Sequence, residues 1–298
     1  KNRVHYIDLA SDLPWDSVRR QLSHDNAWKA ANLIAIMGLG EDPGMSNIFA
    51  RHIADKLDQA SEIRIRDGDN AFSKEFAFPC LFSPDVLIDE VFNPPATYED
   101  GVLHKLSPLS GEEVYKFPEP IGPLTVYNVD HEETETLPKF LDKGIHYVDF
   151  KLAFSPQTVE MLKILKQLNL TSKEPITVKG VKIAPRDVLL ALLPKPANLA
   201  GKVEGYSCIA VNVTGQRSGK KVRALAYTFM SHQEAYKKYG VTATSYLTGT
   251  PTAVGAVMLA KGDIKVKGVI PPECLDPKPL LAEIEKKGIK VHEKMQEI

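Results

Sequence analysis

A histidine followed by a carboxylate, His131-Glu132, is the pair in this chain best suited to proton transfer. Histidine titrates near neutral pH, and a neighbouring carboxylate can tune it into a general acid or base. Most loop histidines have no catalytic role, so the pair is a candidate only. Asp8 is a second catalytic candidate, because it lies in an apolar strand pattern, residues 4–9, at whose carboxyl end ligands bind in open α/β folds.

Two further charged side chains could contact a substrate. Glu90 stands in the otherwise apolar segment 86–91, where a carboxylate can bind an amino group or lie on an exposed helix face. Lys151 ends a strand pattern and could pair with a substrate carboxylate, although such a lysine is normally solvated. Ser11 and Asp12 precede a helical pattern from Trp15, so we interpret them as helix caps.

Residues 38–47 have the composition of a ligand-binding loop between a strand and a helix. They follow an apolar run, residues 33–37, and precede apolar residues at helical spacing. Such a loop brings backbone groups and a helix N-terminus to a ligand, although short glycine-rich connections are often only structural. The residues that permit the sharp turn and cap the helix are Gly40, Pro43, Gly44, Ser46 and Asn47.

This loop resembles that of the saccharopine dehydrogenase family and its relatives, the lysine dehydrogenases and carboxynorspermidine synthases. The family's loop reads approximately Gly-x-Asp-Pro-Gly-x-Ser/Asp-Asn/His, and residues 42–47 match it, beginning at Asp42. The family often has an apolar residue or glycine where Glu41 stands, so Glu41 is not a candidate. The other similar segments span nearly the whole chain, and they are residues 4–11, 88–90, 117–122, 131–132, 136–138 and 248–252.

The resemblance implies an NAD(P)-dependent oxidoreductase that interconverts an amine and an imine at a C–N bond of an amino acid or opine-like substrate. Thr250 is included because Gly249 and Pro251 predict a turn at the start of an apolar helix, with a helix cap as the alternative. The implied catalytic residues are His131 and Asp8. The implied cofactor contacts are Gly40, Pro43, Gly44 and Ser46, and the implied substrate contacts are Glu90, Glu132, Thr250 and Asn47.

One family feature is missing from this sequence. Family members begin with a nucleotide-binding half that contains a Gly-x-Gly-x-x-Gly turn, and this chain has no such turn. Residues 1–37 look like the last strands and helix of that half, so we expect the sequence to begin inside a domain. The alternative function is therefore an inactive fragment, or a binding and dimerisation module that does not bind a dinucleotide.

Composition favours small-molecule chemistry. The 298 residues are 43% hydrophobic, enough to bury a core, and 37 Lys and Arg nearly balance 38 Asp and Glu. No apolar run approaches the roughly 20 residues that span a bilayer. The widely separated Cys80, Cys208 and Cys274 argue against disulfides and structural zinc, and no His-Glu-x-x-His supports a metal-dependent hydrolase. We expect a cytoplasmic homodimer with a small amino-acid substrate, and no nucleic-acid, membrane or metal partner.

The pattern of elements predicts three parts and an α/β plus α+β fold class. Residues 1–58 alternate strand and helix like the C-terminal part of a Rossmann domain. Residues 59–242 predict a mixed-sheet domain for substrate binding and dimerisation, and residues 243–298 a closing helix, buried on most sides, and a tail that pack back on the first part. We expect strands at 4–9, 33–37, 62–66, 75–82, 102–105, 124–129, 145–151, 202–214 and 220–229, and helices at 15–31, 47–57, 157–167, 186–193, 243–259 and 278–287.

Overall fold

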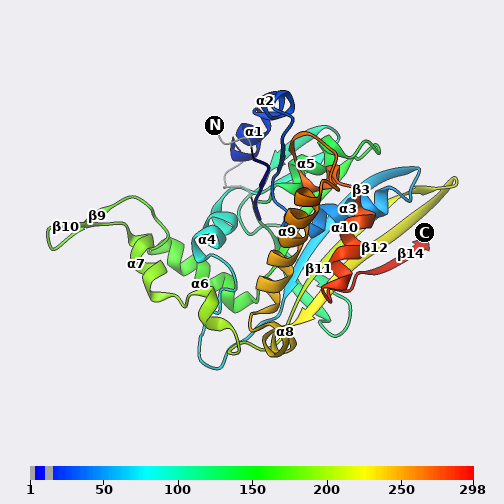
Figure 1. The fold of residues 1–298 in the computed structure, drawn as a ribbon. Coiled ribbons are helices and arrows are strands. Elements are labelled where there is room, and N and C mark those ends of the chain that lie inside the picture. The colour runs from blue at the N-terminus through cyan, green and yellow to red at the C-terminus, as the bar shows by residue number, and fades with distance from the viewer. Residues whose placement is uncertain (1–3, 11–15) are drawn as a thin grey trace.

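The computed structural model describes residues 4–10 and 16–298, which form two main β-sheets, a separate two-stranded hairpin and the helices around them (Figure 1). The smaller sheet is parallel, with strand order β1 (Tyr6–Ile7), β2 (Ile34–Ile36), β13 (Gly268–Ile270). Its central strand is buried on both faces, since Ala35 packs with α1 (Asp16–Leu22) and α2 (Asp25–Ala30). The opposite face, with Ile34 and Ile36, joins the main core, and this two-sided burial explains the continuous apolar run of β2.

The larger sheet has nine strands in mixed orientation. Its main order is β14-β12-β11-β3-β8-β4-β5, with β7 paired to β8 and β6 to β7. Only β3 and β8 pair in parallel, and the other ladders are antiparallel. The strands are β3 (Gln59–Asp69), β4 (Ala96–Glu99), β5 (Val102–Lys105), β6 (Glu113–Lys116), β7 (Pro123–Asn128), β8 (Tyr147–Ala153), β11 (Tyr206–Arg217), β12 (Lys220–Ser231) and β14 (His292–Glu297).

The two faces of the larger sheet differ in chemistry. On β3, Ile63 and Ile65 point into the main core, and the two-residue period carries Asp67 to the same face. Arg66 lies on the opposite face, where its guanidinium binds Asp149 at 2.8 and 2.9 Å. The sheet therefore separates an acidic site on the core face from an ion-pair network on the other.

Helices of the main body cover the core face and connect the two sheets. The long helix α9 contacts β1 of the small sheet and β11 and β12 of the large one, and it runs between α8 and the region of α1 and α2 (Figure 1). These helices are α3 (Met45–Ala54), α4 (Pro84–Phe92), α5 (Glu133–Phe140), α8 (His232–Tyr239), α9 (Ala243–Lys261) and α10 (Pro277–Lys286).

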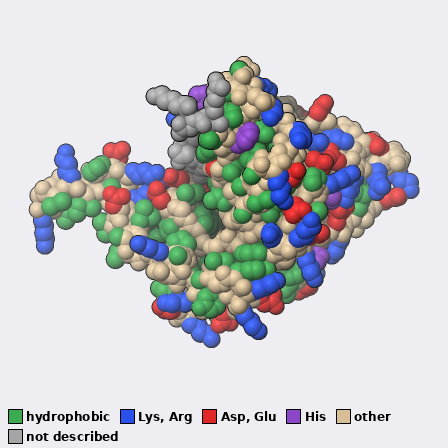
Figure 2. Space-filling model, in the orientation of Figure 1, with side chains coloured by type: hydrophobic (Ala, Val, Ile, Leu, Met, Phe, Trp, Pro, Cys, Tyr) green, Lys and Arg blue, Asp and Glu red, His purple; other side chains and the backbone are tan. Residues whose placement is uncertain are grey.

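An arm made of α6 (Pro156–Gln167), the hairpin β9 (Ile176–Val178) with β10 (Val181–Ile183), and α7 (Pro185–Leu192) projects from the body (Figure 1). Figure 2 shows hydrophobic side chains on its surface, and Val181 is 58% exposed. Arg186 of α7 joins the arm to α4 by contacts to Asp85 at 3.0 Å and Asp89 at 2.6 Å.

The predicted mixed α/β fold is confirmed, and most predicted elements lie within a few residues of their expected bounds. The hairpin of β11 and β12 is tighter than expected, because only Ser218 and Gly219, both with positive φ, form the turn. The predicted homodimer and the division into three parts stay predictions. Among the described residues, every helix is too short or too polar to cross a membrane.

Three element predictions are wrong. Residues 75–82 form no strand, since Pro79 has no N–H for a ladder and the segment lines a cavity instead. The helix expected at 15–31 is broken into α1 and α2 at Ser23 and His24, while Ser11 and Asp12 lie outside the described residues. Helix α9 is not buried on most sides, because a face that includes Val257, 52% exposed, lies open.

Candidate active site

An acidic cluster lies where the loop after β2, the end of β3, α4 and the start of α5 meet. Its side chains are close enough that each carboxylate affects the pKa of its neighbours. The members, which we call the acidic cluster, are Glu41, Asp42, Asp67, Asp69, Glu90, His131, Glu132, Glu133 and Glu273.

His131 and Glu133 form the centre of the cluster. Nδ1 of His131 is bonded to Oε2 of Glu133, whose other oxygen accepts a 2.6 Å hydrogen bond from Ser46. The imidazole stacks on Phe150 with 3.7 Å between ring centroids, so its plane is fixed. Burial alone would lower the pKa of His131, but Glu133 and the neighbouring carboxylates raise it to about 10. At neutral pH the ring is protonated and can act as a general acid.

Asp42 and Asp67 lie too close together in a buried site for both carboxyl groups to be ionised at once. Burial, followed by repulsion from Asp69, raises the pKa of Asp67 to about 7, and the Asp67 carboxylate is hydrogen-bonded to Asp42. A hydrogen bond between two carboxyl groups requires a proton on one of them. Burial and the charges of Asp67 and Glu41 raise the pKa of Asp42 well above its usual value, so the proton belongs to this carboxyl pair.

Glu90 lies on the inner face of α4 and is only 8% exposed. Burial raises the pKa of Glu90 to about 8 against the opposing charge of His131, with Glu132 and Asp67 adding to the rise. The exposed-face alternative for Glu90 is therefore wrong. Burying a carboxylate in ionised form is costly, so a cationic ligand beside Glu90 would be favourable.

A cavity of about 120 Å³ opens at the end of β3, and Asp67, Asp69, Ser207 and Thr244 supply its polar atoms. It adjoins a wider cavity of about 570 Å³ that also touches Asp69. Neither lining contains a lysine or arginine among the described residues. The apolar walls of the two cavities include Phe76, Phe78, Cys80, Leu81, Phe82, Leu87, Leu152 and Phe154.

The loop after β2 packs against the acidic cluster and holds it through hydrogen bonds. Its amides are bonded within the loop, with Gly40 N–H to the Pro43 carbonyl at 2.8 Å and Gly44 N–H to Asn47 at 2.9 Å. Asn47 also donates to Glu273 at 2.9 Å. Gly40, Pro43, Gly44, Ser46 and Asn47 are all buried. The structure thus gives these residues a supporting role, and their predicted contacts to a cofactor or substrate stay predictions.

Three other sequence candidates are not members of the acidic cluster. The Asp8 carboxylate accepts from the Gly38 N–H and from Gln21, so it fixes the base of the loop, and a catalytic role for Asp8 stays a prediction. Lys151 lies on the opposite face of β8, bonded to Glu113 at 2.8 Å. Alternation along the strand points Lys151 away from the acidic cluster, and its pairing with a substrate carboxylate stays a prediction.

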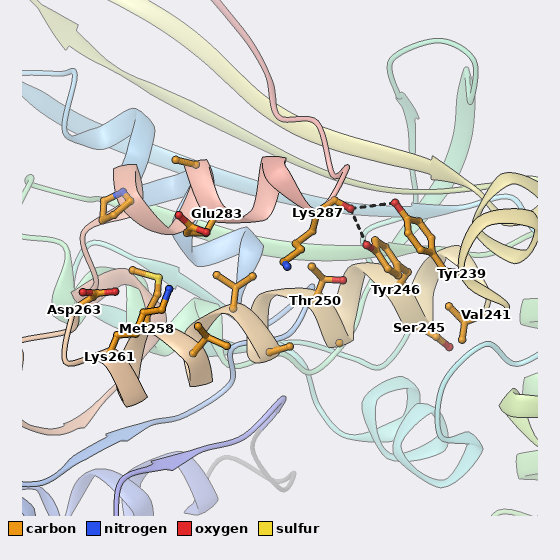
Figure 3. A pocket seen from close by; sticks show the side chains of 16 residues that line it. Tyr239, Val241, Ser245, Tyr246, Thr250, Met258, Lys261, Asp263, Glu283 and Lys287 are labelled. Atoms are coloured by element: carbon orange, nitrogen blue, oxygen red, sulfur yellow. Dashed lines mark hydrogen bonds between the residues drawn. The ribbon is translucent and has the colours of Figure 1, made fainter.

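The placement of Thr250 at a helix N-terminus is wrong. Helix α9 begins at Ala243 and continues through Pro251, so Thr250 lies in the helix interior and its N–H is not free for an anion. Its side chain lines a separate groove of about 770 Å³ between α9 and α10, beside Tyr246 and Lys287 (Figure 3). That groove contains no member of the acidic cluster.

The sequence reasoning missed Asp67, Asp69, Glu133 and Glu273 and set Glu41 aside, although Glu41 is 3% exposed and accepts from Ser207 at 3.2 Å. A signal for two of them was present. The strand prediction ended at residue 66, but the period of Ile63 and Ile65 continues to Asp67 and Asp69, which puts two carboxylates on the core face.

Comparison with known proteins agrees with this geometry. The sequence pattern of the saccharopine dehydrogenase C-terminal domain matches residues 40–289. The chain belongs to the saccharopine dehydrogenase family. The carboxyaminopropylagmatine dehydrogenase of Synechocystis sp. is 31% identical over 295 residues, which cover 97% of this chain and 73% of that protein.

Two other relatives support the same conclusion. The carboxynorspermidine synthase of Vibrio alginolyticus is 28% identical over 97% of this chain and 72% of its own length. The structure of saccharopine dehydrogenase (L-Glu forming) from Saccharomyces cerevisiae superposes with a TM-score of 0.69 over 97% of this chain and 79% of that chain. At 16% identity that superposition shows a shared fold. The relatives of this family member are thus named as dehydrogenases and synthases.

Proposed function

We propose that this chain carries the substrate site of an NAD(P)-dependent oxidoreductase that acts on the secondary amine of a carboxyl-bearing polyamine. The observation that carries the proposal is the acidic cluster beside a cavity without lysine or arginine in its described lining. An opine-type amino acid carries several carboxylates and would be repelled there. A polyamine carries several positive charges, and its methylene chains suit the phenylalanine walls.

The names of the relatives support the same substrate class. Carboxyaminopropylagmatine and carboxynorspermidine are both polyamines that carry an added carboxyl group. A bound nicotinamide would supply the hydride acceptor: the carbon beside the secondary amine would lose a hydride and the nitrogen a proton, which leaves an imine. Water then splits the imine into an aldehyde and an amine, and the reverse sequence forms the C–N bond.

His131 would exchange the proton of the reacting nitrogen. Its Nδ1 is occupied by Glu133, so Nε2 is the atom left to face the substrate. In the direction of amine formation, the protonated ring donates to the nitrogen as the hydride arrives at carbon. In the reverse direction the neutral ring accepts that proton, while Glu133 and Phe150 hold its orientation.

The described residues do not provide a complete dinucleotide site. The chain has no Gly-x-Gly-x-x-Gly turn, and the amides of Gly40 and Gly44 are bonded within their own loop. The carboxyl ends of β1 and β2 lie beside the acidic cluster, which is where ligands meet open parallel sheets. We therefore assign the substrate side of the reaction to this chain and no step to a bound cofactor.

The test is an assay of the purified protein with carboxynorspermidine or carboxyaminopropylagmatine and either NAD⁺ or NADP⁺, followed by absorbance of the reduced nicotinamide. We expect the protein to bind one of these substrates and not saccharopine, and to reduce the nicotinamide with that substrate if the purified protein also binds the dinucleotide. Binding of the polyamine without reduction would favour the binding-module alternative. Turnover of saccharopine in preference to both polyamines would overturn the proposed substrate class.

A further inference from the structure

Resting on the proposed function, we propose that Asp69 binds the outer cationic group of the amine substrate and thereby selects amines by length. Asp69 lies at the junction of the two cavities and contributes to the lining of both. Asp67 lines the smaller cavity and interacts electrostatically with His131 and Glu90, so the reacting nitrogen would sit at the Asp67 end. A substrate held there must extend past Asp69 to reach the wider cavity.

The Asp69 carboxylate is held in place by neutral donors. It accepts from the Ala71 N–H at 2.7 Å and from the Thr244 hydroxyl at 3.1 Å, and His232 Nε2 lies 3.3 Å away. The buried His232 ring accepts the Ala243 N–H at Nδ1, so its proton is on Nε2 and the ring is neutral. These contacts fix the position of the carboxylate without a cation to neutralise it.

The spacing of the carboxylates fits a short diamine. Asp67 and Asp69 are two residues apart on one face of β3, a separation of roughly 6.6 Å along the strand. Two amino groups joined by a short methylene chain span a comparable distance. Phe78 and Phe154 line the passage, and Phe154 lines both cavities, so the methylenes would pass over apolar surface.

Glu90 gives an independent sign that the inner end accepts a cation. Glu90 is only 8% exposed, and the charged groups that act on it include His131, Glu132 and Asp67. A cation beside Glu90 and Asp67 would satisfy the inner end, while a second cation would reach Asp69. The site therefore has an inner and an outer anionic position, and Asp69 is the carboxylate that lines both cavities.

The test measures binding of amines by calorimetry without any nicotinamide cofactor. The probes are butylamine, with one cation, and 1,3-diaminopropane, 1,4-diaminobutane and agmatine, with two. We expect Asp69→Asn to weaken the two-cation probes at least tenfold and butylamine less than twofold. The control Asp263→Asn, at an exposed carboxylate beyond the end of α9, should change neither class.

A second variant tests length directly and keeps the charge. Asp69→Glu moves the carboxylate inward or outward by one methylene, so the preferred diamine should change by about one carbon. Equal weakening of butylamine and diamines by Asp69→Asn, or unchanged length preference in both variants, would overturn the proposal. Binding of MgCl₂ as tight as that of the diamines would also overturn it, since the position would then select charge alone.

These outcomes separate the subsite from the proposed reaction. If the amines bind as expected but no substrate is oxidised, the assignment of Asp69 to the outer cationic group is supported and the oxidoreductase proposal fails. If a polyamine is oxidised but Asp69→Asn leaves the KM for every amine unchanged, the reaction stands and the outer position fails.

Discussion

His131 is the residue on which the proposed chemistry depends most directly, because Glu133 and Phe150 fix its ring and Glu133 keeps it protonated. We expect His131→Asn to lower kcat by about 10²- to 10⁴-fold, the usual contribution of a general acid or base. Steady-state kinetics at saturating substrate measures this. The matched control His146→Asn removes an exposed histidine that pairs with Asp100, and it should retain activity. Equal activity of both variants would remove His131 from the mechanism.

Asp67 and Glu90 predict that amine binding depends on pH. Their pKa values are raised to about 7 and about 8 when the site is free, and a bound cation favours the ionised forms. Binding should therefore release protons and tighten as pH rises from 6 to 8. Calorimetry in two buffers of different ionisation enthalpy measures the number released. Glu90→Gln should reduce that number, and proton uptake on binding would contradict the assignment.

At the scale of elements, the loop after β2 depends on glycine at position 44. Gly44 has φ of 136°, and a Cβ there would overlap the backbone of Gly40. We expect Gly44→Ala to destabilise the protein by more than about 3 kcal/mol, since strain and overlap add. Gly219→Ala is the control, because it also has positive φ but faces open space, and it should cost about 1 kcal/mol. Chemical denaturation measures both, and similar losses would mean that the loop can relax.

The arm is held to the site helix α4 through few contacts. Arg186, which is 7% exposed, binds Asp85, Asp89 and the Thr171 carbonyl, and α4 carries Glu90 on its inner face. We expect Arg186→Met to cost about 2 kcal/mol, discounted because Asp85 is partly solvated. It should also speed proteolysis within residues 168–195. Lys220→Met, which breaks an exposed pair with Glu297, should cost less than about 0.5 kcal/mol. Unchanged proteolysis in Arg186→Met would show that other contacts hold the arm.

For the whole molecule, the acidic cluster makes stability depend on pH. The pKa values of Asp67, Glu90 and His131 are all raised on folding, so the folded state binds protons more tightly than the unfolded state. The stabilisation that these three groups contribute is complete at pH values below their pKa in the unfolded chain. It is lost as pH rises through the folded-state pKa of about 7 for Asp67, about 8 for Glu90 and about 10 for His131. The melting temperature of the free protein should therefore fall between pH 6 and 9.

Thermal melts across that range test this prediction. Glu90→Gln should flatten the fall, whereas Glu285→Gln, at an exposed position of α10, should leave it unchanged. A polyamine should offset the fall at pH 8, because a cation compensates the ionised carboxylates. A melting temperature that rises from pH 6 to 9 would contradict the raised pKa values.

The sequence by itself determined the features that depend on neighbouring residues. Alternation and helical spacing predicted β2, α3 and most strands of the large sheet, because burial of one face follows the local period of the chain. The same local reading selected His131 and Glu90, and both lie in the acidic cluster. It failed at Thr250, since Gly249 and Pro251 suggested a helix start that packing of α9 overrode.

Only the tertiary structure decided which charges meet. Ser46 became a donor to Glu133, and Asp67 joined Asp42, because segments far apart in the chain converge at one edge of two sheets. Lys151 was placed outside the acidic cluster by the face of β8 on which it lies. The physical reason is that desolvation and charge coupling depend on distance in space, whereas a sequence pattern records only the order of residues along the chain.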